Sequence, residues 1–319
     1  MSEYQYYEFL ALDKPLTPAQ IEAVGQFSSR ADISTTRFVN TYNYGDFRGD
    51  ETDFLTRYFD LHVYVANWGT RRFALALPAQ LLDLPVVKDY QDDDSFDIQT
   101  KSNRLILTFT SQEEGGDGDY GGAGWMASLA PLREELSGGD LRVLYLAWLV
   151  AVTEATIADE LWEPPVPAGL RKLTAAQKSF VSFMRIDPEI LEVAAQVSPE
   201  LNAAQPDAPR FLAGLPAQGK DAFLLAVLEG RATEVARDLR TRLRRAYPLA
   251  GPAKSRRTVG ALRAAAKKLA TEHERIRAEE NARQKAVPPP KPPPPAPNIC
   301  AKSPREKNNF GNRCTTVSP

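Results

Sequence analysis

The chain has 319 residues, of which 43% are hydrophobic, enough for one large domain or two modest domains that each bury a core. Its net charge of -2 conceals an asymmetry, because residues 1–163 carry 27 acidic and 12 basic side chains, whereas residues 164–319 carry 14 and 27. The only cysteines, Cys300 and Cys314, lie near the C-terminus, which excludes a disulfide framework in the core.

The first residues do not have the pattern of an export signal. Residues 1–14 combine acidic and aromatic side chains, without a basic segment followed by an apolar run. The most apolar window, residues 141–153, is shorter than the roughly 20 residues that cross a membrane. We therefore expect a cytoplasmic protein that does not engage the membrane.

The N-terminal region predicts strands with helices inserted between them. Aromatic residues dominate 4–12, which favours a strand, and Thr17-Pro18-Ala19-Gln20 then provides a capping box with a first-turn proline. A second strand is predicted over 33–43, where β-branched and aromatic residues are concentrated. Asp50 is suited to cap the short helix that follows.

Two hairpins are predicted next. Residues 61–66 and 72–77 read as strands joined by Asn67-Trp68-Gly69-Thr70, and residues 95–110 read as a hairpin that turns at Ser102-Asn103. Six strands with inserted helices predict an α+β domain over residues 1–112 with a mostly antiparallel sheet.

The remainder of the chain is predicted to be helical. Residues 113–124 form a flexible loop rich in glycine and aspartate, and residues 125–250 form a helical module. Within this module, apolar residues surround the helix that begins near Leu141, so this helix should be central. A long charged helix is expected over 254–286, followed by a proline-rich, disordered tail over 287–319.

The sequence contains one phosphate-loop-like pattern and no recognisable metal motif. Gly214 to Lys220 has the glycine and lysine spacing of a phosphate-binding loop, but Asp221 replaces the required Ser or Thr, so a turn between helices is favoured. The two histidines, His62 and His273, are far from each other and from the cysteines. We expect neither a metal nor a cofactor.

The basic C-terminal part provides the strongest functional signal. Residues 235–285 carry 15 basic and five acidic side chains, a density that favours a nucleic acid or an acidic protein as partner. The candidate partner-binding residues are Arg237, Arg240, Arg244, Arg245, Arg256, Arg257, Arg263, Lys267 and Lys268.

The long helix also permits two other interpretations. Leu262, Ala266, Leu269, His273 and Ile276 alternate at spacings of four and three, the seam of a short coiled coil that would give a weak homo-oligomer. Alternatively, the helix is exposed and has no partner.

A polar and aromatic neighbourhood in the N-terminal half is a second candidate site. Its members are Arg37, Tyr42, Arg48, His62, Tyr64, Asn67, Trp68 and Arg71. If they line a cleft, the arginines would bind an anion and His62 would act as a general base. In the competing interpretation, the aromatic rings pack in the core and the arginines pair with nearby carboxylates.

The stretches Tyr6-Tyr7-Glu8-Phe9, Arg37 to Asp50 and Tyr64 to Arg71 resemble an uncharacterised family of bacterial proteins. The resemblance covers about the first quarter of the chain and implies a bacterial cytoplasmic origin. It assigns no activity, ligand or catalytic residue to any of these positions.

Together, these observations predict a non-enzymatic interaction or adaptor protein whose basic C-terminal helices engage a partner protein or nucleic acid. The alternative is an enzyme or small-anion-binding protein that uses the Arg37 to Arg72 neighbourhood. The sequence leaves open whether the protein has a catalytic activity.

Overall fold

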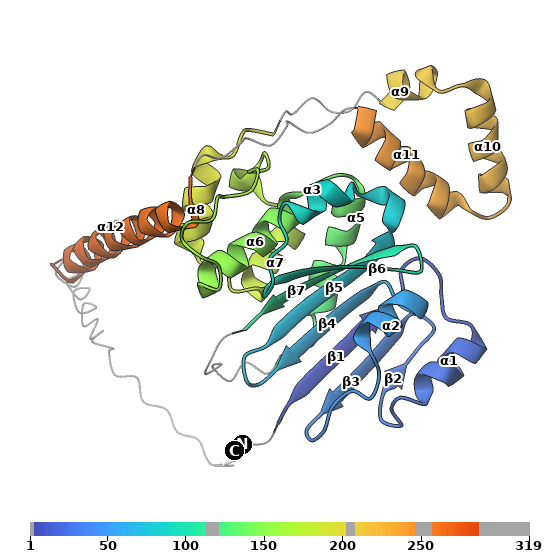
Figure 1. Cartoon of the computed structure of the whole chain (residues 1–319), viewed down its shortest axis with the longest axis horizontal. Coiled ribbons are helices and arrows are strands. Elements are labelled where there is room, and N and C mark those ends of the chain that lie inside the picture. The colour runs from blue at the N-terminus through green and yellow to red at the C-terminus, as the bar shows by residue number, and fades with distance from the viewer. Residues whose placement is uncertain (1–2, 113–120, 202–207, 247–256, 287–319) are drawn as a thin grey trace, which may run out of the picture. The chain divides into compact units, whose positions relative to one another are not determined.

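The computed structural model describes residues 3–112, 121–201, 208–246 and 257–286 (Figure 1). By its internal contacts the chain divides into two units, Met1–His273 and Glu274–Pro319. The expected flexible loop over 113–124 lies mostly outside the described residues, and the expected tail over 287–319 lies entirely outside them.

The first unit contains a seven-stranded antiparallel sheet, which confirms the predicted α+β class. The strand order is β2-β3-β1-β4-β5-β7-β6. The strands are β1 Gln5–Leu10, β2 Asp32–Ile33, β3 Arg37–Tyr42, β4 Leu61–Ala66, β5 Arg71–Pro78, β6 Phe96–Lys101 and β7 Arg104–Ser111. The strand expected over 33–43 is interrupted, so its first residues form the short edge strand β2 and the rest form β3.

The predicted turns join β4 to β5 and β6 to β7. Gly69, with a φ of 100°, sits in the turn between β4 and β5, where a side chain would be strained. Ser102 and Asn103 both have positive φ in the turn between β6 and β7. Phe73 pairs with Phe109 and Phe96 also pairs with Phe109, so three aromatic residues lie in one row across the sheet.

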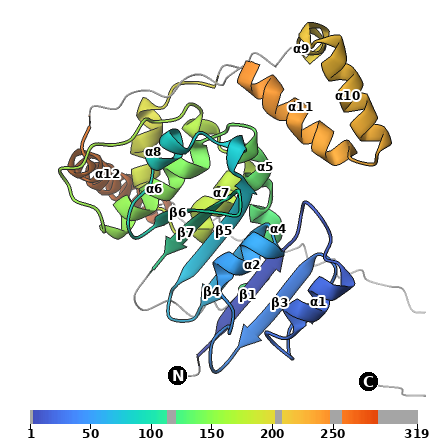
Figure 2. The same ribbon diagram turned by 45° about the vertical axis from the view of Figure 1, so that its right-hand side comes forward.

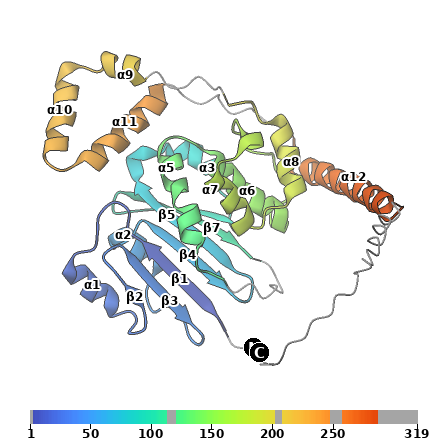
Figure 3. The ribbon, with the colours of Figure 1, turned by 180° about the vertical axis from the view of Figure 1, so that it is seen from behind.

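Helices cover both faces of the sheet. The helices α1 Pro18–Gly25 and α2 Glu51–Arg57 cover one face, where Val24 and Phe54 pack with Phe9 and Phe38. The opposite face is covered by α4 Trp125–Leu129, α5 Pro131–Ser137, α6 Arg142–Glu154, α7 Ala175–Phe183 and α8 Pro188–Val197. Figure 1 shows α2 in front of the sheet, and Figure 3, seen from behind, shows α5 on the opposite side next to β5.

The predicted caps start these helices. Thr17 and Thr174 each form a capping box, with Gln20 and Gln177 respectively, and Asp50 accepts a hydrogen bond from the Asp53 N–H. Three further helical segments are short: Ala79–Leu81, α3 Leu84–Lys88 and Leu170–Lys172.

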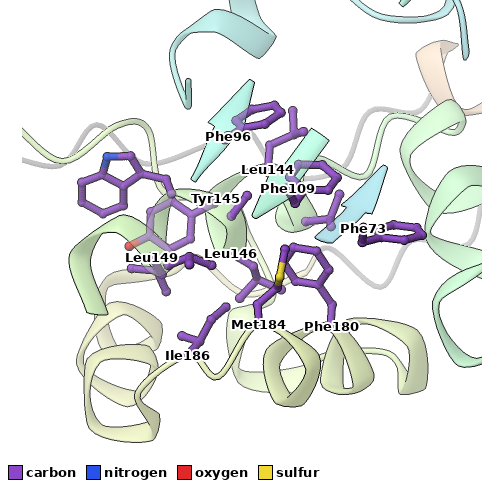
Figure 4. Close-up of a cluster of buried hydrophobic side chains, with 14 of the residues drawn as sticks. Phe73, Phe96, Phe109, Leu144, Tyr145, Leu146, Leu149, Phe180, Met184 and Ile186 are labelled. Atoms are coloured by element: carbon purple, nitrogen blue, oxygen red, sulfur yellow. The ribbon is translucent and has the colours of Figure 1, made fainter. Parts of the chain in front are cut away.

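Helix α6 lies at the centre of the larger core, as its apolar circumference predicts. Eleven of its 13 residues are buried. Figure 4 shows Leu144, Tyr145, Leu146 and Leu149 of α6 between the row Phe73, Phe96, Phe109 and the side chains of Phe180, Met184 and Ile186. This cluster continues across the expected boundary at 113–124, so the sheet and the helices share one core.

The remaining helices are α9 Ala208–Gly214, α10 Ala217–Leu228, α11 Ala232–Ala246 and α12 Val259–Ala286. Helices α10 and α11 lie side by side, and α9 contacts α11 (Figure 2). We call residues 208–246 the three-helix module and the sheet with α1–α8 and the start of α12 the body.

Among the described residues, no single helix is both long enough and apolar enough to cross a membrane. Two pairs of helices reach the required length and apolar composition only when the two helices of a pair are counted together, and each pair is sharply bent. They are Trp125–Ser137 with Arg142–Glu154 and Ala208–Gly214 with Ala217–Leu228.

Candidate functional site

The residues of the predicted ligand neighbourhood do not line one cleft, because they lie on both faces of the sheet. Side chains alternate along a strand, so His62 and Tyr64 of β4 point to the face covered by α1 and α2. Arg37 and Arg71 point to the opposite face. The sequence pattern placed these residues on neighbouring strands but could not assign their faces, since that depends on the pairing register.

His62 is fully buried and held from both sides. Its Nδ1 lies 3.1 Å from the Glu8 carbonyl oxygen, so this nitrogen donates, and its Nε2 lies 3.3 Å from Glu51 Oε2. The imidazole also stacks on Phe9 at 4.0 Å. With no exposed surface, His62 cannot reach a substrate in this conformation.

The Glu51 carboxylate links His62 to a guanidinium. Arg72 Nη1 donates to Glu51 Oε2 at 2.6 Å. Burial raises the pKa of Glu51, but the attraction of His62 and Arg72 exceeds that effect and lowers the pKa to about 2. The carboxylate is therefore ionised at neutral pH and serves as a counter-charge rather than as an acid.

A second buried network lies beside the first and surrounds Gln5. The hydroxyls of Tyr7 and Tyr64 both donate to Gln5 Oε1 at 2.9 Å, while Gln5 Nε2 donates to Asp46 Oδ1 at 2.5 Å. Burial raises the pKa of Tyr64 to about 12, so its phenol remains protonated as a donor. These contacts fit a structural role for Tyr64.

The other predicted residues of this neighbourhood have separate structural contacts. Arg37 Nε donates to the buried Glu8 at 2.7 Å, Asn67 Oδ1 accepts from the Tyr4 N–H, and Arg71 Nη1 donates to the Phe183 carbonyl. Tyr42 packs edge-on against Tyr7, whereas Arg48 and Trp68 are exposed.

Two of the predicted partner-binding arginines are occupied within the body. Arg257 donates from Nη2 and Nε to Glu163, at 2.6 and 2.8 Å, and the same carboxylate accepts from the Tyr145 hydroxyl. Arg263 donates to Asp159 Oδ1 at 2.5 Å and to the Val152 carbonyl at 3.0 Å. Both guanidiniums fasten the start of α12 to the end of α6 and the segment that follows it.

The remaining partner-binding candidates differ in what the structure describes. Lys267 and Lys268 have exposed side chains on α12. Arg256 lies outside the described residues, and for Arg237, Arg240, Arg244 and Arg245 only the backbone in α11 is described.

The first part of the coiled-coil seam is covered by the chain itself. Leu262 and Ala266 are buried in the core cluster, and Leu269 packs against it. His273 Nδ1 lies 3.4 Å from Glu189 of α8. These positions therefore have an intramolecular partner in place of a second copy of the helix.

The three-helix module has an apolar groove that the sequence analysis missed. It encloses about 510 Å³ and is lined by Leu212, Ala213, Leu215, Lys220, Phe223, Leu224, Val227, Val235 and Leu239. Lys220 is the only charged residue in that lining. The signal in the sequence was the run Phe223 to Leu228, which is too apolar for a fully solvated helix.

Gly214 to Lys220 spans the end of α9, the predicted interhelical turn at Leu215 and Pro216, and the first residues of α10. Lys220 Nζ donates to the Ala213 carbonyl at 3.3 Å, across the turn. Within the described part of the chain, no three His, Cys, Asp or Glu side chains are grouped to hold a metal ion.

Searches against family models, curated proteins and solved structures found no match for this chain.

Proposed function

We propose that this chain is a non-enzymatic interaction protein whose three-helix module binds an acidic, amphipathic helix of a partner protein. The groove of α9–α11 receives the apolar side of that helix, and the basic residues of α11 attract its acidic side.

The observation that carries this proposal is the exposed apolar surface of α10. Leu224, Leu225 and Leu228 are 64%, 57% and 84% exposed. Leu224 also lines the groove, so the exposed side chains and the hollow form one continuous apolar surface. Contiguous surfaces of this kind are typical of binding sites, and a partner helix inserts side chains spaced by three and four residues.

The positive charge of the module favours a partner with a negative charge. Residues 208–246 carry eight basic and four acidic side chains, a net charge of +4. Five of the basic residues are arginines of α11. An acidic partner would gain association rate from this charge, while the apolar contacts would supply most of the affinity.

The same surface favours a protein over nucleic acid. Nucleic acid is bound mainly through its phosphates, which need cations and make no use of an apolar groove. In addition, Arg257 and Arg263 are committed to Glu163 and Asp159, which reduces the cationic surplus that the sequence suggested.

The test uses the full-length protein and a labelled synthetic helix of about four turns, with leucines spaced by three and four and glutamates elsewhere. Fluorescence anisotropy should show saturable binding, which Leu224→Asp weakens by about 100-fold because a carboxylate would face the apolar groove. Leu161→Asp is the matched control, since Leu161 is 50% exposed but lies in the body.

Three results would contradict the proposal. One is equal weakening by both substitutions. Another is tight binding of duplex DNA that falls steeply with salt while the peptide does not bind, which would restore the nucleic-acid alternative. The third is a loss of thermal stability in Leu224→Asp, which would mean that another part of this chain covers the groove.

A further inference from the structure

One end of the sheet contains a hollow whose lining includes none of the candidate site residues named from the sequence. The segments that border it are the loop leading into α1, the end of α2, the end of β5 and the turn between β6 and β7. Antiparallel pairing brings these segments to the same end, because Leu10 pairs with Leu61 and Pro78 pairs with Arg104. The hollow encloses about 530 Å³, within the range of small-molecule sites.

Its floor is an ion-pair network in which Asp13, Asp60 and Arg104 line the hollow, and the buried Arg133 pairs with both carboxylates from outside that lining. Asp60 is buried and accepts from Arg104 Nη2 at 2.5 Å and from the backbone N–H groups of Leu12 and Asp13. Arg133, also buried, donates to both carboxylate oxygens of Asp13 at 3.0 and 2.7 Å. The charges of the floor are therefore balanced, and the network fixes the backbone that precedes Lys14.

Two further cations line the hollow, Lys14 without an ion pair within the described ranges and Arg57 with a long one that it shares. The Lys14 ammonium is exposed and has no ion pair within the described ranges. Arg57 reaches only Asp53, at 3.7 Å, and Asp53 is also bound by Lys101. Because the floor is neutral, Lys14 and Arg57 give the hollow a positive excess.

The rest of the lining suits the uncharged part of a small organic molecule. Pro15, Tyr58 and Pro78 contribute apolar ring surfaces. Ser102 and Asn103, held at positive φ in the hairpin turn, add exposed polar groups. A rigid wall with a few polar groups and a charged rim is typical of ligand sites.

We propose that this hollow binds a small organic anion. Its phosphate or carboxylate would lie on Lys14 and Arg57, and the flat or apolar part of the molecule would lie against Pro15, Tyr58 and Pro78. This site lies at the end of the sheet that carries the turn between β6 and β7, shares no lining residue with the groove of the three-helix module, and does not depend on the interaction function proposed for that module.

The experiment measures binding to the full-length protein by isothermal titration calorimetry with three probes. Inorganic phosphate tests the charged group alone. Adenosine monophosphate adds a flat ring system to a phosphate, and benzoate presents a carboxylate on a ring. We expect saturable binding of adenosine monophosphate or benzoate, with a higher affinity than that of inorganic phosphate. The preferred probe then identifies the charged group as a phosphate or a carboxylate.

Substitutions at the rim locate the site. Lys14→Ala and Arg57→Ala should each weaken binding about tenfold, because each removes one charged hydrogen-bond donor without touching the core. Arg48→Ala, which removes an exposed arginine from the neighbourhood predicted by sequence, should leave binding unchanged.

The proposal is overturned if none of the three probes binds saturably, or if Arg48→Ala weakens binding as much as Arg57→Ala does. The Lys14 and Arg57 variants should still bind the acidic helical peptide with wild-type affinity. Failure at this hollow is therefore distinguishable from failure at the module.

Discussion

The body and the three-helix module of this chain differ in how far they bury apolar and charged side chains. In the body, Phe73, Phe96 and Phe109 have no exposed surface, and the Glu163 carboxylate receives three side-chain donors. In the module, Leu228 is 84% exposed, and Arg242 pairs with Asp238 along the helix surface. The body buries its apolar and charged groups among one another, whereas the module leaves such groups exposed on its surface.

The sharpest way to break this comparison is to truncate one apolar side chain in each region. Phe109→Ala should lower the free energy of unfolding by about 3–5 kcal/mol, because it leaves a cavity where strands and helices meet. Leu228→Ala should change it by less than about 0.5 kcal/mol. Urea titrations of both variants measure this, and similar losses would mean that α10 is packed against another part of the chain.

Ion pairs provide the second comparison. Arg257→Ala should cost about 3 kcal/mol, because it leaves the buried Glu163 without its counter-charge. Arg242→Ala should cost less than about 0.5 kcal/mol, since its pair with Asp238 is exposed. Thermal unfolding of the two variants checks this, and a small effect at Arg257 would show that the start of α12 is not fastened as described.

The third comparison is a pH dependence that arises in the body, at Glu51. The pKa of Glu51 is about 2 in the folded protein and 4.5 when unperturbed, so its ionised form is preferred on folding. This stabilisation is complete above about pH 4.5 and is lost as the pH falls toward 2.

Glu51→Gln tests this dependence. Its loss of stability relative to wild type should be largest at neutral pH and should shrink as the pH is lowered through that window. Chemical unfolding at a series of pH values provides the measurement, with the exposed Glu22→Gln as control. A constant difference between wild type and Glu51→Gln would contradict the assigned role of Glu51.

Local sequence signals predicted the elements of the body well. Thr17 with Gln20 and Thr174 with Gln177 start helices as expected, and the hairpin turns occur at Gly69 and at Ser102-Asn103. These features depend on a few neighbouring residues, so they can be recognised without knowing the fold.

The arrangement of the candidate sites could not be predicted in the same way. The burial of His62 depends on β4 lying between β1 and β5, and the pairing of Arg257 with Glu163 joins residues 94 positions apart. The sequence analysis treated His62 and Arg257 as available to bind a ligand or partner. In the structure, Glu51 lies beside His62 and Glu163 pairs with Arg257. The hollow beside Lys14 likewise assembles from four segments that no local pattern connects.

The position of Arg257 has a mechanical consequence. The described segments on either side of the module are both tied to the body, because the Ser198 hydroxyl accepts from the Leu170 N–H and Arg257 donates to Glu163. A single protease cut at the exposed Gly230 would therefore not release α12, because Val259 and Leu262 remain buried. The nicked protein should run as one particle in native size-exclusion chromatography and as two fragments in denaturing electrophoresis.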